Sequence, residues 1–205
     1  RSIPHPMLAE YSNGKVAKAK DILEGQPFEC PMMPFGGMEE VAWSPDSKKL
    51  AYVLRQKNGR DYAVSTDSDI FLYDINDGSS LNLCKPITRD IKQPIKIDYT
   101  RSLKDQRIYE GEDCNLGYDD NPKFSPDGKY IAWTSMKHDG YESDRTRLCV
   151  YEFSTRNKTY VTESFDSGVD NFFWKENSKE LLFAGVWHGR TNIYATNLKG
   201  KVRQL

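Results

Sequence analysis

One pattern constrains this chain more than any other feature, because it recurs three times at wide spacing. It runs from Val41 to Tyr52 as Val-Ala-Trp-Ser-Pro-Asp-Ser-Lys-Lys-Leu-Ala-Tyr and from Lys123 to Trp133 as Lys-Phe-Ser-Pro-Asp-Gly-Lys-Tyr-Ile-Ala-Trp. A divergent copy, in which Lys-Glu-Asn replaces Ser-Pro-Asp, runs from Phe173 to Phe183. Proline presets φ for a turn, and aspartate accepts hydrogen bonds from nearby backbone N–H groups. Each copy therefore predicts two strands joined by a tight turn, with a weaker turn signal in the third.

Two more strand-like runs follow each hairpin. The first is rich in β-branched and aromatic residues, and the second is short and preceded by turn residues. The first runs are Asp69–Asp74, Arg147–Glu152 and Asn192–Thr196, and the second are Leu81–Leu83, Tyr160–Thr162 and Val202–Leu205. Each unit therefore has four antiparallel strands, which is the composition of a β-propeller blade.

The spacing of the repeats favours an all-β fold, a β-propeller fragment of three four-stranded antiparallel blades. Phe124 and Trp174 lie about 50 residues apart, as expected for a kelch-sized blade. We expect blades at about 38–84, 118–162 and 168–205, with a loop insertion at about 85–117. Residues 1–37 then form a partial N-terminal blade, with Asn13-Gly14 as a hairpin turn and an outer strand from Lys18 to Leu23.

Composition excludes several classes of partner. The chain has 29 Lys and Arg against 30 Asp and Glu, a net charge of −1, which argues against nucleic acid. No apolar run reaches the ~18 residues that a membrane span needs. The chain begins with Arg1 and shows no signal peptide, so we expect it to be an excised segment of a longer protein.

The four cysteines do not form a metal or redox motif. No CxxC pair occurs among Cys30, Cys84, Cys114 and Cys149. We expect Cys149 to be a core residue. Cys84 and Cys114 flank the insertion and could form a disulfide in an oxidising compartment.

The repeat resembles the propeller repeats of TolB, Tricorn and the prolyl oligopeptidase (S9) family, described as PD40 or WD40-like. Longer stretches favour bacterial dipeptidyl aminopeptidases of the last family. They are Pro31–Trp43, His138–Asp144 and Ser164–Asp170. The resemblance covers the chain outside about 86–117.

This resemblance implies a two-domain serine peptidase. A separate α/β-hydrolase domain of the same parent chain would carry the catalytic triad. The propeller would gate entry and position short peptide substrates. The resemblance also implies a periplasmic or secreted protein.

The chain itself shows no catalytic motif. It lacks the Gly-x-Ser-x-Gly elbow of such hydrolases. Its three histidines are His5, in an expected loose terminus, and His138 and His188, in expected solvated loops. We therefore expect no catalytic residue, no cofactor and no metal site; Asp74–Gly78 resembles only the start of a calcium loop.

Recurring carboxylates suggest a binding site. In four-stranded antiparallel units the Ser-Pro-Asp turns share one face, and the crossings between blades share the other. On the crossing face, Glu39, Asp120 and Asp170 each stand four residues before an aromatic residue. These acids, with Glu40, could hold the α-amine of a peptide by a charge-assisted hydrogen bond. Alternatively, they bond backbone N–H groups and fix the crossings.

Other classes of function stay open. The chain could be a stand-alone TolB-like propeller that binds other envelope proteins. A WD40 scaffold is disfavoured because the Trp-Asp and Gly-His signatures are absent. An open arc of blades would expose its terminal faces, so we expect self-association or marginal solubility.

Overall fold

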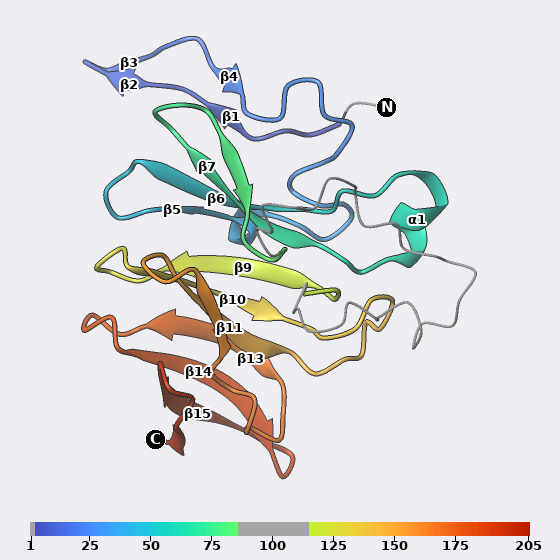
Figure 1. Ribbon diagram of the computed structural model, residues 1–205, viewed down its shortest axis with the longest axis vertical. Helices are drawn as coiled ribbons and strands as arrows, with labels where there is room; N and C mark the ends of the chain where they lie inside the picture. Colours follow the sequence, from blue (N-terminus) through green and yellow to red (C-terminus); the bar gives the residue numbers. More distant parts are fainter. Residues whose placement is uncertain (1–2, 86–114) are drawn as a thin grey trace.

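The computed structural model describes residues 3–85 and 115–205, and within them the fold is all-β (Figure 1). Three four-stranded antiparallel sheets follow one another along the chain. The first contains β5 (Val41–Trp43), β6 (Lys49–Leu54), β7 (Asp69–Asp74) and β8 (Ser80–Asn82). The second contains β9 (Asp119–Phe124), β10 (Tyr130–Ser135), β11 (Arg147–Glu152) and β12 (Asn157–Tyr160). The third contains β13 (Val169–Trp174), β14 (Glu180–Trp187), β15 (Arg190–Asn197) and β16 (Val202–Gln204).

The sheets are stacked face to face, because their central strands bury side chains on both faces. In β6, Leu50, Tyr52 and Leu54 pack toward the N-terminal segment, whereas Ala51 and Val53 pack toward the second sheet. The second sheet repeats this alternation. Its β10 places Ile131 and Trp133 in the core shared with the first sheet, and Ala132 in the core shared with the third. The two-residue period of a strand thus divides each sheet between two cores.

The three repeat hairpins use one turn, including the divergent third copy. Asp46 accepts hydrogen bonds from the Ser44 hydroxyl and the Lys48 N–H, and Asp127 does the same with Ser125 and Lys129. In the third turn, Asn177 accepts from the Lys179 N–H at 2.9 Å.

The fourth position of each turn is left-handed. Ser47, Gly128 and Ser178 occupy it, with φ of 58°, 70° and 55°. The Asp127 N–H also donates to the Ser178 hydroxyl at 3.0 Å, so the turns of the second and third sheets lie side by side.

The N-terminal region forms two small ladders rather than a full sheet. In the first ladder β1 (Met7–Leu8) pairs with β4 (Lys20–Asp21), and in the second β2 (Tyr11–Ser12) pairs with β3 (Lys15–Val16). The predicted Asn13-Gly14 turn joins β2 and β3, with both residues at positive φ. Leu23 and Cys30 then pack against the outer face of the first sheet.

Three details differ from the sequence-based expectations. The loop at 55–68 contains a short helix, α1 (Gly59–Val64), and the crossing into the first sheet contains a 3-10 turn, η1 (Met38–Glu40). The outer strand of the second sheet is β12 at 157–160, before the predicted 160–162. It begins early because Arg156, with φ 59°, closes a tight turn directly after β11.

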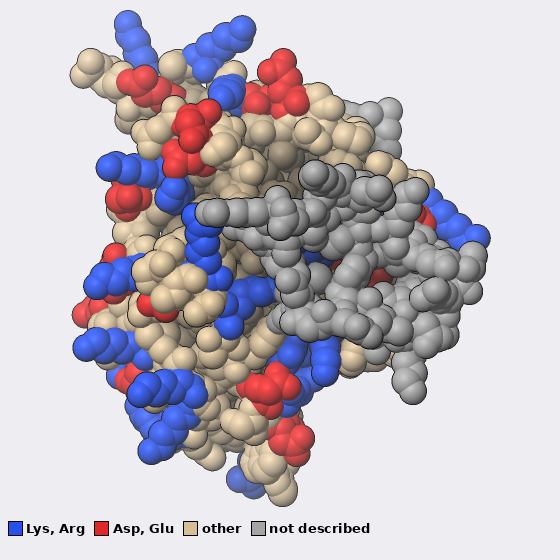
Figure 2. Space-filling model, viewed as in Figure 1, with Lys and Arg blue, Asp and Glu red and all other residues tan. Residues whose placement is uncertain are grey.

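The loops and crossings gather at one end of the sheets and the hairpin turns at the other (Figure 1). Acidic and basic side chains are interspersed along the hairpin-turn edge in Figure 2. Among the described residues, no helix has the length and apolar character of a membrane span.

Candidate functional site

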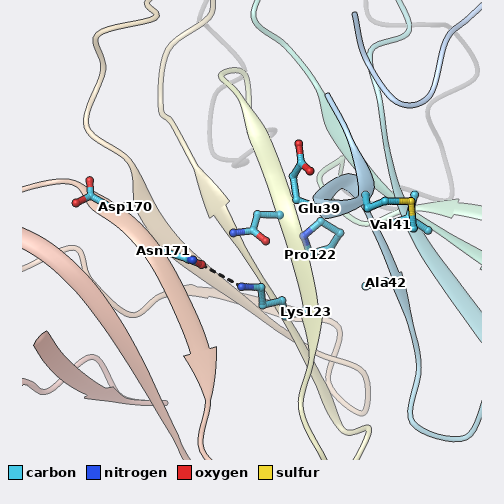
Figure 3. Close-up of a pocket in the computed structure, with 9 residues that line it drawn as sticks. Glu39, Val41, Ala42, Pro122, Lys123, Asp170 and Asn171 are labelled. Atoms are coloured by element: carbon cyan, nitrogen blue, oxygen red, sulfur yellow. Dashed lines mark hydrogen bonds between the residues drawn. The ribbon is translucent and has the colours of Figure 1, made fainter. Parts of the chain in front are cut away.

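A pocket of about 470 Å³ lies where the first strands of the three sheets come together. Its walls come from η1 and from β5, β9 and β13 (Figure 3). The lining residues are Met38, Glu39, Val41, Ala42, Asn121, Pro122, Lys123, Asp170 and Asn171. Two of the four predicted carboxylates, Glu39 and Asp170, therefore share one pocket although 131 positions separate them in the sequence.

Irregular strand pairing shapes two walls of this pocket. The pairing of β9 with β10 shifts register between Ala132 and Thr134, opposite Asn121 and Pro122. The pairing of β13 with β14 shifts between Val169 and Asn171, so that Asp170 is the extra residue. Asn121 has φ of 58°, and its N–H donates to Asp120 Oδ1 at 2.5 Å. Bulges reorient side chains at strand ends, and both irregularities fall at residues that line the pocket, Asn121, Pro122 and Asp170.

Lys123 supplies a positive charge at the floor of the pocket. Its Nζ donates to Asn171 Oδ1 at 3.1 Å (Figure 3) and to the Phe172 carbonyl at 2.7 Å. The ammonium also lies 4.7 Å and 4.5 Å from the ring centroids of Phe172 and Phe173. Burial lowers the pKa of Lys123. Lys123 thus joins β9 to β13 and adds a cation to the lining of the pocket.

The other two predicted carboxylates have backbone partners. Glu40 is buried, and its Oε2 accepts the Met32 N–H at 2.8 Å. Burial raises the pKa of Glu40 to about 7, against the opposing effect of the Met32 hydrogen bond, and the neighbouring Asp120 and Glu39 raise it further. Burial also raises the pKa of Asp120. Glu40 therefore bonds the crossing at Met32, and Asp120 bonds the bulge at Asn121.

The predicted histidine environments are partly wrong. His5 lies just before β1 and is half-buried, and its Nδ1 is 2.8 Å from Asp21 Oδ2 because β4 runs back beside β1. His138 is half-buried and pairs with Asp144 at 2.9 Å. Asp144 also accepts the N–H groups of Lys137 and His138, so it organises that loop.

The prediction for Cys149 is confirmed, whereas the possible Cys84–Cys114 disulfide involves a residue outside the described part of the chain. Cys149 is buried in the core between the first and second sheets, as expected. Cys84 is a buried free thiol, whereas Cys114 and most of the predicted insertion lie outside the described residues.

Seven of the nine lining residues were not predicted as site residues, and among them Lys123 and Asn171 are joined by a hydrogen bond between the second and third sheets. The signal available was Asn121-Pro122, because proline within a strand is confined to edges and bulges. No neighbouring sequence signal identifies Lys123 or Asn171 as site residues, because their hydrogen bond joins the second sheet to the third.

Comparison with known proteins first assigns a class. Over 92% of its length the chain matches TolB from Acinetobacter baumannii, with a TM-score of 0.50 and 21% identity, and covers 34% of that structure. This likeness shows a β-propeller type of fold. No family model matches the chain.

Sequence comparison then identifies particular relatives. The chain is 40% identical over all 205 residues to dipeptidyl-peptidase 5 of Porphyromonas gingivalis, of which it covers 26%. It is 38% identical over 145 residues to dipeptidyl-peptidase 5 of Porphyromonas endodontalis, matching 71% of this chain and 17% of that protein. The chain thus spans about a quarter or less of the length of these relatives. The resemblance to dipeptidyl aminopeptidases is confirmed.

Proposed function

We propose that this chain is a non-catalytic propeller segment of a dipeptidyl-peptidase-like serine peptidase, in which it positions short peptides for a separate hydrolase domain. The observation that carries this proposal is the 40% identity along the entire chain to a segment of a dipeptidyl-peptidase 5. Because the similarity extends over the whole chain, it supports a shared role for this chain and the matching segment of the relative.

We further propose that the three sheets are consecutive blades and that β1–β4 belong to a partial fourth. The face-to-face cores on both sides of the second sheet support this arrangement. The outer face of the third sheet exposes Phe173 by 60% and Ile193 by 50%, which suits packing against another sheet. By the same resemblance, we propose a periplasmic or secreted location.

The pocket at the first strands has the chemistry to hold a peptide N-terminus. Glu39 and Asp170 present carboxylates, and the N-terminal residue of a peptide presents an ammonium group. A hydrogen bond between charged partners contributes about 1.5–3 kcal/mol. Lys123 and Asn171 add donors that suit a peptide carbonyl. In this proposal the pocket fixes the free amine, and the distance from amine to scissile bond sets a dipeptide product.

The experiment is a kinetic comparison in the full-length protein with dipeptide-derived chromogenic substrates. Glu39→Gln and Asp170→Asn keep the shape of each side chain and remove its charge. We expect at least one of them to lower kcat/KM by about 10- to 100-fold, mostly through KM, because a uniform binding interaction is lost. Unchanged KM and kcat/KM in both variants would remove the amine-anchor role.

Asp46→Asn provides the matched control. Asp46 lies in a hairpin turn at the opposite end of the sheets and bonds Ser44 and Lys48. Its replacement should leave kcat/KM unchanged. A blocked, N-acetylated substrate should also be insensitive to Glu39→Gln, because it has no ammonium group.

The stand-alone TolB-like alternative stays a hypothesis. The structural likeness to TolB is a likeness of fold, so it gives this alternative no functional support. The coding sequence around this segment distinguishes the two: a Gly-x-Ser-x-Gly elbow in the same open reading frame supports the peptidase.

A further inference from the structure

A second group of potential ligands lies between the first and second sheets and shares no residue with the lining of the pocket. Asp69 begins β7, Cys84 follows β8, and Asp119 begins β9. All three side chains are buried, and one ligand atom from each lies within 4.8 Å of the other two. The topology brings them together because β7 starts, β8 ends and β9 starts at the crossing end of the sheets.

Two carboxylate oxygens in this group, Asp69 Oδ1 and Asp119 Oδ2, have no hydrogen-bond partner among the described residues, and of the two only Asp69 Oδ1 has an ion-pair partner, Lys85. Asp119 is fully buried, and its Oδ1 accepts the Trp133 Nε1–H at 2.6 Å and an Asn115 amide N–H at 2.9 Å. Its Oδ2 is buried without a partner. A buried oxygen in this state costs free energy unless something binds to it.

The neighbouring groups are held in place by their own contacts. Asp69 accepts the Asn82 amide at 2.9 Å and pairs with Lys85 at 2.9 Å. Lys85 also pairs with Asp67 at 2.7 Å. Cys84 Sγ accepts the Ile70 N–H at 3.2 Å, and the Cys84 N–H donates to Asn82 Oδ1. Asn82 therefore orients both Asp69 and Cys84.

We propose that Asp69, Cys84 and Asp119 form a site for one thiophilic divalent cation of the zinc class, which joins the first sheet to the second. Two carboxylates and a thiolate belong to the ligand set of zinc. Tetrahedral binding at about 2.0–2.3 Å requires ligand atoms about 3.3–3.8 Å apart, so the three side chains, whose ligand atoms all lie within 4.8 Å of one another, would have to draw together around the ion. The three ligand charges are balanced by the ion and by the Lys85 ammonium.

Cobalt titration of the chelator-treated full-length protein tests this proposal. A Cys84–Co²⁺ bond gives a thiolate-to-cobalt charge-transfer band in the near ultraviolet, and Zn²⁺ should abolish the band at one ion per chain. Cys84→Ser should remove the band. Asp119→Asn, which keeps the Trp133 contact, should weaken Co²⁺ binding by roughly tenfold or more. Cys149→Ser is the matched control, because Cys149 is equally buried in the same core and should leave the band intact.

A second measurement, the stabilisation of the fold by Zn²⁺, is independent of the cobalt absorption band. Zn²⁺ at 100 times its dissociation constant should raise the free energy of unfolding by about 2.7 kcal/mol in the parent protein, and Asp119→Asn should lose most of that gain. The proposal is overturned if the parent protein gives no band and no stabilisation. It is also overturned if the band persists in Cys84→Ser, since another thiol would then be the ligand. If Cys84→Ser does not fold, the test rests on the cobalt band of the parent protein and on the weaker Co²⁺ binding expected of Asp119→Asn.

Discussion

The two ends of the first strands, β5, β9 and β13, use acidic residues in opposite ways. At the hairpin end, Asp46 and Asp127 are exposed or nearly so, and each is saturated by its own turn. At the crossing end, Glu40 is buried and Asp120 half-buried, while Glu39 and Asp170 line a pocket. Where a turn supplies hydroxyl and N–H donors, a repeated acid has a local structural role. At the bulges and the crossings between sheets, the acids either line the pocket or bond backbone groups outside a hairpin turn.

The largest expected difference between the two ends is in the pH dependence of stability. Burial raises the pKa of Glu40 from 4.5 to about 7 in the folded protein. The folded state then holds the proton more tightly than the unfolded state, so this contribution to stability is present below about pH 4.5 and is lost as the pH rises to about 7. Glu40→Gln should reduce the loss of unfolding free energy between pH 4 and pH 8 by about 3 kcal/mol. Denaturant unfolding from pH 4 to 8 measures it.

The hairpin end should show the opposite sign. Although burial acts to raise the pKa of Asp127, the hydrogen bonds from Ser125 and Lys129 lower it overall. Its contribution is present above its ordinary pKa and is lost as the pH falls below it. A Glu40→Gln variant with the same pH profile as the parent would break the proposed difference between the ends.

Replacing a glycine by alanine should destabilise the protein more at the crossing end than at the hairpin end. A Cβ on Gly36, in the crossing, would lie 2.0 Å from Glu40 Oε1 and 2.5 Å from the Met32 carbonyl oxygen. Gly36→Ala should therefore cost about 1–3 kcal/mol and disturb Glu40. Gly128→Ala, in a turn with φ 70° and its nearest neighbour 3.9 Å away, should cost about 1 kcal/mol. Urea unfolding of both variants gives the comparison, and equal losses would contradict it.

The smallest effect should come from a single turn acid. Asp127→Ala removes the acceptor for the Ser125 hydroxyl and the Lys129 N–H, and should cost about 1 kcal/mol in urea unfolding. Asp127→Asn should recover most of this loss, because Asn177 serves as the acceptor in the third turn. If Asp127→Asn were as damaging as Asp127→Ala, charge rather than hydrogen bonding would be the stabilising property.

The sequence predicts local features of this fold well. Ser-Pro-Asp turns and alternating strands depend on neighbouring residues, so the hairpins, the three four-stranded units and the burial of Cys149 follow from the pattern. Even the third turn forms without proline, because Asn177 and Ser178 supply the acceptor and the left-handed position.

The features that the sequence does not predict depend on contacts between sheets. Glu39 and Glu40 are adjacent in the chain, yet one lines the pocket and the other is buried against Met32. Lys123 belongs to the repeat, and its role at the pocket comes from Asn171 and Phe172 on the next sheet. The α1 helix in the loop at 55–68 likewise has no strong local signal.

A structure of the full-length protein with a dipeptide product bound would test the proposed amine site most directly. We predict that the peptide ammonium lies within hydrogen-bonding distance of Glu39 or Asp170, at the crossing end of β5 and β13. An ammonium held at the hairpin end, or by acids outside this pocket, would contradict it.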